Sequence, residues 1–186
     1  MGNLTDHFAG GGGGSNILEK ISLICDGRSV TAADGTTVYT SETATRLLST
    51  TSFQTWTGST LSYKPPENTK AVVYEFFGDI GHSSTNQLGS LGLYVDDVLV
   101  TSSRRAWYGT STYSSAEPFV TTLEVGASTE SVSTGKIGTW TSNKELKLKF
   151  REHSASYRFY INDLNYWNGS STNDIKYPTL IITALS

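Results

Sequence analysis

From residue 26 to its end, this 186-residue chain is a succession of short apolar runs separated by turn-forming residues at intervals of roughly ten. No helical pattern longer than three turns follows Cys25, which argues against helix-covered parallel sheets. The 25 serines and 26 threonines fit this pattern, because threonine favours strands and serine favours turns. The sequence therefore predicts an all-β fold, a jelly-roll-type antiparallel β-sandwich.

Two hairpins can be placed from their turn residues. Residues 29–32 and 36–40 flank Ala33-Asp34-Gly35, an Asp-Gly corner between two strand-forming runs. Residues 91–101 predict a tight hairpin that closes at Asp96-Asp97. Aspartate is a favoured turn residue, and a calcium loop needs more oxygen ligands at fixed spacing. We therefore expect these two carboxylates to form a turn and not a metal site.

The strongest strand signal is the nearly continuous apolar run at 71–77, which predicts a central strand buried on both faces. Residues 144–151 alternate charged and apolar side chains, so they predict a strand with one wet face. The final strand should cover 179–185. Further short strands are expected at 61–63, 104–113, 119–125, 137–141 and 157–161, with a threonine-rich stretch at 44–59.

The clearest boundary in the chain is a run of five glycines, Gly10–Gly14, followed by Ser15. Consecutive glycines lose too much backbone entropy to hold regular structure, so residues 10–15 predict a flexible linker. Residues 1–9 contain Leu4 and Phe8 and are too few to fold alone. They predict an N-terminal anchor that orders on a partner. The alternatives are a disordered tail or an engineered linker, for which Gly-Gly-Gly-Gly-Ser is also used.

Residues 16–25 lie between this linker and the predicted sandwich. Ile17, Ile21 and Ile24 follow one another at spacings of four and then three, and isoleucine at both seam positions favours coiled coils of three or more helices. The segment predicts a short helical collar in which these isoleucines contact one another in a trimer. The alternative is a helix or strand packed on its own domain. Cys25 is the only cysteine, so it forms no internal disulfide, and its apolar surroundings predict a small buried hydrophobe.

The charge of the chain excludes one class of partner. The formal net charge is −3, the isoelectric point is about 5.6 and no basic tract is present, so we expect no binding to nucleic acid. The sequence lacks a run of about 18 apolar residues, and its N-terminus lacks the basic and apolar regions of a signal peptide. We therefore expect no membrane span and synthesis in a cytoplasm without secretory export.

Motifs for catalysis or metal binding are missing from the sequence. His7, His82 and His153 lie far apart, without a second histidine or a cysteine at metal-ligand spacing. A glycosidase needs two carboxylates across a cleft, and the available glutamates give no sign of converging. These glutamates are Glu75, Glu117, Glu124 and Glu152. We expect a protein that is not an enzyme and that has no cofactor.

The aromatic residues give the best candidates for a binding surface. Trp107-Tyr108 and Tyr166-Trp167 are adjacent pairs, and adjacent residues of a strand point to opposite faces. One member of each pair should therefore point outward or into an interface, and Tyr113 lies close to the first pair. Exposed tryptophan and tyrosine are typical of carbohydrate or protein contacts. The alternative is that these side chains lie in the core or between subunits.

Six segments resemble structural proteins of tailed phages of marine cyanobacteria and related bacteria. They read NILE at 16–19, CDGRSVT at 25–31, TGSTLSYKPP at 57–66, VYEF at 73–76, NYWNG at 165–169 and YPTLIIT at 177–183. The resemblance implies a virion component such as a fibre, tail-associated or capsid-decorating protein. Such heads are commonly trimeric jelly rolls similar to tumour-necrosis-factor-like domains. The resemblance brings no defined binding motif, so it assigns no functional residue.

These observations together predict a protein located in the virion. Residues 1–9 dock on capsid or tail proteins, 10–15 give slack, 16–25 help to form a homotrimer, and 26–186 form the projecting head. Symmetric assembly would turn weak contacts into avidity. The alternative is a lectin-like, host-receptor-binding adhesin module whose outward tryptophan or tyrosine residues stack on host surface glycans.

Overall fold

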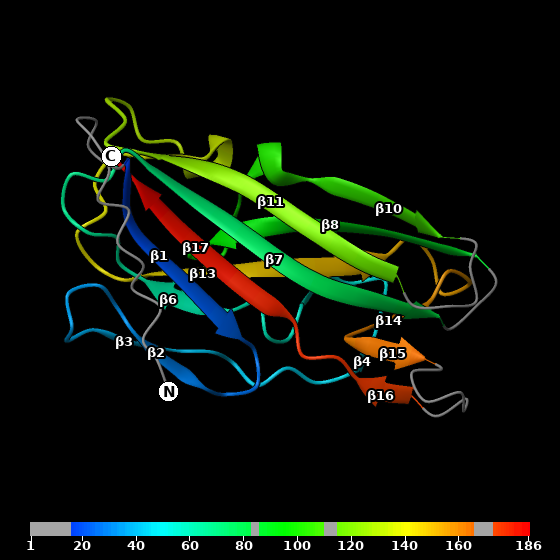
Figure 1. The fold of residues 1–186 in the computed structure, drawn as a ribbon. Helices are drawn as coiled ribbons and strands as arrows, with labels where there is room; N and C mark the ends of the chain where they lie inside the picture. Colours follow the sequence, from blue (N-terminus) through cyan, green and yellow to red (C-terminus); the bar gives the residue numbers. More distant parts are fainter. Residues whose placement is uncertain (1–15, 83–85, 110–114, 166–172) are drawn as a thin grey trace.

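The computed structural model describes residues 16–82, 86–109, 115–165 and 173–186, which form two packed β-sheets (Figure 1). The seven-stranded sheet contains β1 (Ile17–Ile24), β4 (Leu47–Leu48), β7 (Ala71–His82), β11 (Ser115–Val125), β12 (Lys136–Ile137), β14 (Phe159–Ile161) and β17 (Thr179–Leu185). The six-stranded sheet contains β5 (Gln54–Thr55), β6 (Leu61–Tyr63), β8 (Gln87–Val95), β9 (Val98–Leu99), β10 (Arg105–Gly109) and β13 (Lys144–Glu152). The predicted all-β sandwich is confirmed.

Smaller elements lie outside these sheets. Two hairpins form separate two-stranded sheets, and two 3₁₀ turns are the only helical elements of the described residues. The hairpins pair β2 (Ser29–Thr31) with β3 (Val38–Thr40), and β15 (Asp163–Asn165) with β16 (Asn173–Ile175). The 3₁₀ turns are η1 (Thr101–Ser103) and η2 (Val132–Thr134).

The longest strand, β7, lies at the centre of the seven-stranded sheet. This sheet has the order β1-β17-β7-β11-β12, with β14 beside the far end of β7. The second sheet has the order β10-β8-β13-β5, with β6 also paired to β13. Neighbouring strands are antiparallel, except that β12 runs parallel to β11. Figure 1 shows β1, β17, β7 and β11 as one layer, with β13 and β8 behind them.

Aromatic side chains from both sheets interlock between the layers. From β7, Tyr74 and Phe76 point inward and are fully buried. The Phe76 ring meets the ring of Trp56 edge-on at 5.4 Å, and Trp56 in turn meets Phe150 of β13 at 5.9 Å. Edge-to-face pairs of this kind stabilise a core beyond their buried area. The alternation of apolar and polar residues thus places one face of each long strand in a common core.

Both predicted hairpins are confirmed. Asp96 and Asp97 close the β8–β9 hairpin with positive φ angles of 47° and 65°, as a two-residue turn with the right twist requires. In the β2–β3 hairpin, Asp34 accepts hydrogen bonds from the Thr37 hydroxyl (2.6 Å) and from the backbone amides of Thr36 and Thr37. These bonds stabilise the carboxylate and lower the pKa of Asp34 to about 2.

The predicted helical collar at 16–25 is wrong, because residues 17–24 form the edge strand β1, paired with β17. A strand turns adjacent side chains to opposite faces, so the three isoleucines cannot share one seam. Ile21 is 2% exposed in the core of its own sandwich and is unavailable to a neighbouring copy. Ile17 and Ile24 are 50% and 40% exposed. The segment therefore belongs to the head.

The prediction that residues 71–77 are buried on both faces is wrong for a single copy of the chain. The inward side chains of β7 are buried as expected. On the outer face, however, Val73 and Glu75 are only half-buried and Phe77 is 40% exposed. The structure therefore leaves uncovered a strand face whose composition is typical of a covered one.

Cys25 lies at the end of β1 and is fully buried, which confirms its prediction as a small buried hydrophobe. Burial disfavours the thiolate and raises the pKa of this thiol to about 12.

Asn162, which lies between β14 and β15, connects the two layers through its buried side-chain amide. Its Oδ1 accepts a hydrogen bond from Trp56 Nε1 (2.8 Å), and its Nδ2 donates to the carbonyl oxygens of Thr45 (3.0 Å) and Thr57 (2.9 Å). Its backbone is left-handed, with a φ of 55°, a conformation that asparagine tolerates better than most residues. The amide supplies both a donor and an acceptor where no water reaches.

We expect Asn162→Asp to lower the free energy of unfolding by about 3 kcal/mol, because a carboxylate cannot donate to the two carbonyls and is buried as a charge. Chemical denaturation followed by tryptophan fluorescence measures this loss. Asn68→Asp is the matched control, since Asn68 also has a left-handed φ of 66° but is exposed. Equal stability of the two variants would contradict the role given to Asn162.

Candidate functional site

Strand β10 carries the predicted Trp107-Tyr108 pair, and the two side chains point to opposite sides. Trp107 is half-buried, and its ring meets Phe159 edge-on at 5.3 Å. Its Nε1 donates to Glu117 Oε1 of β11 at 2.5 Å, which joins the open edges of the two sheets. Tyr108 points outward and is 63% exposed. Trp107 is thus a packing residue, and Tyr108 is the member of the pair available to a ligand.

Five other predicted site residues lie outside the described residues. They are the anchor residues Leu4 and Phe8 and the surface aromatics Tyr113, Tyr166 and Trp167.

A small apolar slot lies beside Trp107, between β10 and β11. It measures about 100 Å³, and its lining includes Trp56, Phe76, Phe119 and Arg105. Sites for small molecules usually measure about 300–1,000 Å³. The slot is therefore a packing defect at the sheet edge and not a ligand pocket.

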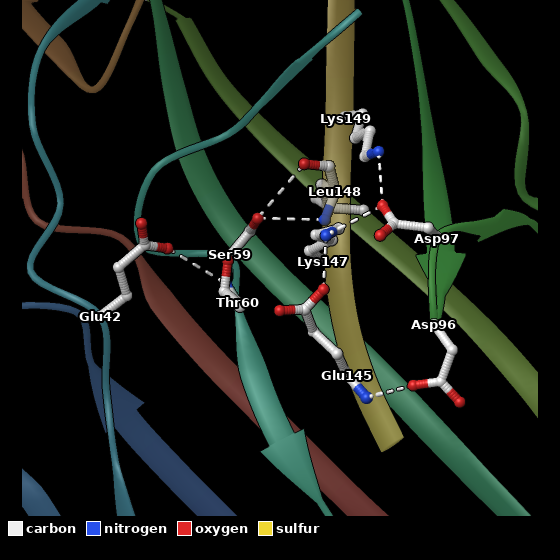
Figure 2. A network of polar contacts seen from close by, with 9 residues as sticks. All are labelled: Glu42, Ser59, Thr60, Asp96, Asp97, Glu145, Lys147, Leu148 and Lys149. Atoms are coloured by element: carbon white, nitrogen blue, oxygen red, sulfur yellow. Dashed lines mark hydrogen bonds and ion pairs between the residues drawn. The ribbon is translucent and has the colours of Figure 1, made fainter.

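The outer face of the six-stranded sheet is basic, and part of its charge is neutralised (Figure 2). Lys147 and Lys149 of β13 both bind Asp97 of the hairpin turn, at 3.0 Å and 2.7 Å, and Lys147 also binds Glu145. Hydrogen bonds from Lys149 and, to a smaller extent, from Lys147 hold the pKa of Asp97 below its usual range. The Glu145 amide donates to Asp96 at 2.8 Å, which fixes the turn against β13.

Figure 2 shows that the same strand is held from its other side. Ser59 Oγ accepts a hydrogen bond from the Leu148 amide at 3.0 Å, and Glu42 accepts one from the Thr60 amide at 3.4 Å. Ser59 is fully buried. These contacts make β13 a rigid platform for the side chains on its outer face.

Aromatic rings and cationic side chains lie next to one another on the outer face of the six-stranded sheet, at β13. The Arg151 guanidinium lies 5.2 Å from the Phe53 ring centre, and Phe53 meets Tyr94 edge-on at 6.2 Å. Lys149 Nζ lies 4.6 Å from the centre of the Tyr94 ring. Cation–ring contacts of this kind orient long side chains without neutralising their charge. Arg151 therefore differs from its lysine neighbours, since it has no carboxylate partner within the part of the chain that the structure describes.

The outer face of the seven-stranded sheet has the opposite character. Three rows of paired residues from β1, β17, β7 and β11 carry only two charges, Lys20 and Glu75. Six of the outward side chains are apolar, and we call these six the apolar face. They are Ile24, Val73, Phe77, Pro118, Val120 and Ile181. Ile24, Phe77 and Val120 are 40–43% exposed. A contiguous apolar surface of this kind is typical of a contact with another macromolecule.

Three of the four carboxylates considered for catalysis serve structural contacts, and the fourth, Glu75, lies on β7 opposite Val120 and Ile181. Glu117 accepts from Trp107, Glu152 is buried and accepts from the Ser49 hydroxyl at 2.6 Å, and Glu124 lies 3.9 Å from Lys136. Within the described ranges, no three His, Cys, Asp or Glu side chains come together as metal ligands would.

The described residues also contain no helix of the length and hydrophobicity needed to cross a membrane. No protein-family model and no curated protein matches this chain. The evidence for function comes from the chemistry of the two outer faces of the sandwich.

Proposed function

We propose that this chain is a structural protein of a tailed-phage virion, with a jelly-roll head that assembles as a homotrimer through the apolar face. The observation that carries this proposal is the uncovered outer side of β7, whose composition suits burial on both sides. The six segments that resemble phage structural proteins give the virion context. The strand orders β1-β17-β7-β11 and β6-β13-β8-β10 support jelly-roll connectivity.

A second copy of the chain suits the apolar face better than solvent does. Burial of exposed apolar area is the main favourable term in protein association. The two charges on this face, Lys20 and Glu75, have opposite signs, so copies of the chain can meet there without net repulsion. Ile24 belongs to the face, and we infer that it is the one of the three predicted isoleucines that contributes a contact between copies.

The position of Asn16, the first described residue, suits an anchored head. The amide of Ser186 donates to the carbonyl of Asn16 at 2.8 Å, so the first and last described residues of the head are neighbours. In Figure 1, β1 begins and β17 ends at the same end of the sandwich. An anchor and linker at residues 1–15 would thus leave the head from one end and keep both outer faces clear of the attachment point.

A second candidate function is host attachment as a lectin-like module. It is favoured by Tyr108, which is 63% exposed on an edge strand of the sheet opposite the apolar face. In an assembled head this residue would remain accessible.

Mass spectrometry and immunogold electron microscopy of purified phage particles test the virion role. We expect peptides of this chain to remain with particles through density-gradient purification, and antibodies against residues 16–186 to label their surface. Abundant protein in the lysate with none in the purified particles would contradict the proposal.

We expect the purified protein to have about three times its chain mass of 20.2 kDa in light scattering, and Val120→Lys to reduce this to the mass of one chain. The added ammonium group lies on the β11 side of the apolar face, opposite Glu75. Removing this ion pair from water costs more than its attraction returns, and the apolar contact of Val120 is lost. Ser62→Lys is the matched control, because Ser62 is an exposed strand residue of the other sheet. A wild-type monomer at all concentrations, or equal masses for both variants, would contradict assembly through this face.

A further inference from the structure

A groove of about 390 Å³ lies on the outer face of the six-stranded sheet, between Phe53 and the start of β10. Its floor is low because β8 presents the small residues Ser90 and Gly92 at this point, and β10 presents Ala106 beside Ser90. A side chain at Gly92 would collide with Leu99, whose Cδ1 would lie 2.8 Å from the added carbon. Two antiparallel strands with small outward residues thus hollow out a surface that longer side chains would fill.

Two arginines from distant parts of the chain, Arg104 and Arg151, line this groove, which we call the basic groove. Arg105 also borders it, but its guanidinium lies 5.8 Å from the centre of the Phe119 ring, toward the other sheet. Arg104 Nε donates to the Thr101 carbonyl at 3.1 Å, and Arg105 donates to the carbonyls of Arg104 and Val120. None of the three forms an ion pair with a carboxylate of the described residues. No aspartate or glutamate from the described ranges lines the groove either.

This local excess of positive charge contrasts with the rest of the protein. The chain carries a net charge of −3, and the lysines of the same sheet are paired with Asp96, Asp97 or Glu145. The positive charges of Arg104 and Arg151 at one hollow repel each other, and an anion between them would remove this repulsion. Arg104 uses Nε for its backbone contact and, among the described residues, Arg151 contacts only the Phe53 ring, so both guanidinium groups keep donors for further acceptors.

We propose that the basic groove binds an oligosaccharide that carries sulfate or carboxylate groups. Guanidinium groups bind such groups through paired, charge-assisted hydrogen bonds. Phe53, whose ring is held by Arg151 and Tyr94 and is 44% exposed, supplies a flat apolar surface for the carbon face of a sugar. The groove thus combines the two contacts that an acidic sugar needs, in a hollow of suitable size.

An acidic saccharide suits this groove better than nucleic acid does. A nucleic-acid strand needs a continuous basic track, whereas Asp96, Asp97 and Glu145 lie on the same sheet face as Arg104 and Arg151. The groove also lies on the sheet opposite the apolar face, so it stays open if the head assembles as proposed. The inference does not depend on the virion role, but repetition in a trimer would convert weak groove binding into firm attachment.

Isothermal titration of the full chain tests this inference with four probes: a heparin tetrasaccharide, tetragalacturonate, neutral maltotetraose and a dodecamer of deoxythymidine. The first two separate sulfate from carboxylate as the recognised group. We expect at least one of them to bind at least about tenfold more tightly than maltotetraose, because charge-assisted hydrogen bonds form only with the acidic sugars. We also expect the interaction to weaken as salt is raised.

We expect Arg104→Ala and Arg151→Ala each to weaken that binding by about tenfold, since each removes a charged donor. Phe53→Ala should weaken binding of the saccharide. It should leave binding of inorganic sulfate, titrated as a further probe, unchanged, because sulfate makes no ring contact. Lys70→Ala is the matched control, because it removes an exposed cation outside the groove. Circular dichroism and mass in solution verify that every variant keeps its fold and assembly.

Three results would overturn the inference. One is the absence of binding to both acidic saccharides, and another is equal weakening by the Lys70 and arginine variants. The third is tighter, arginine-dependent binding of the oligonucleotide, which would identify nucleic acid as the ligand. Because all of these are measured on purified protein, such a failure leaves the particle-composition test of the virion role unaffected.

Discussion

The packing of β7 against Trp56 is the interaction on which the rest of this structure depends. β7 pairs along its length with β17, β14 and β11, and its inward Phe76 meets the Trp56 ring at the centre of the core. Trp56 is in turn held by the buried amide of Asn162. Gly78 allows the two layers to approach this closely, because an added Cβ would lie 2.6 Å from the Trp56 ring. With the core fixed in this way, each strand has one side left to face outward.

The two outward sides differ in chemistry, and this difference organises the functional account. Around Phe77 and Val120 the seven-stranded sheet presents apolar side chains and only two charges of opposite sign, which suits permanent contact with other copies. The six-stranded sheet presents paired lysines, exposed rings, and Arg104 and Arg151, which form no ion pair with the described residues, and this suits a hydrated anionic ligand. A head with one surface for assembly and another for recognition can multiply a weak contact without obstructing it.

Local patterns were sufficient to predict the sandwich, both hairpins and the final strand, because period-two alternation and Asp-rich turns are properties of neighbouring residues. The same reasoning failed at Ile17–Ile24, since three isoleucines at spacings of four and three also fit a strand whose partner, β17, lies at the other end of the chain. It also could not place the basic groove, where Phe53, Arg104 and Arg151 meet only through tertiary pairing. Glycine and serine on the groove floor give no signal in the sequence. The apolar run at 71–77 predicted burial of both faces of this strand, and the single chain covers only its inner face.

The central claim is that the apolar face mediates assembly while the other face stays open to ligands. Hydroxyl-radical footprinting of the purified protein and its Val120→Lys variant tests this claim most directly. The account predicts that Phe77 is protected from oxidation in the wild-type assembly and oxidised in the variant, whereas Phe53 and Tyr94 are oxidised equally in both. Equal oxidation of Phe77 in the two proteins, or protection of Phe53 and Tyr94 in the assembly, would contradict it.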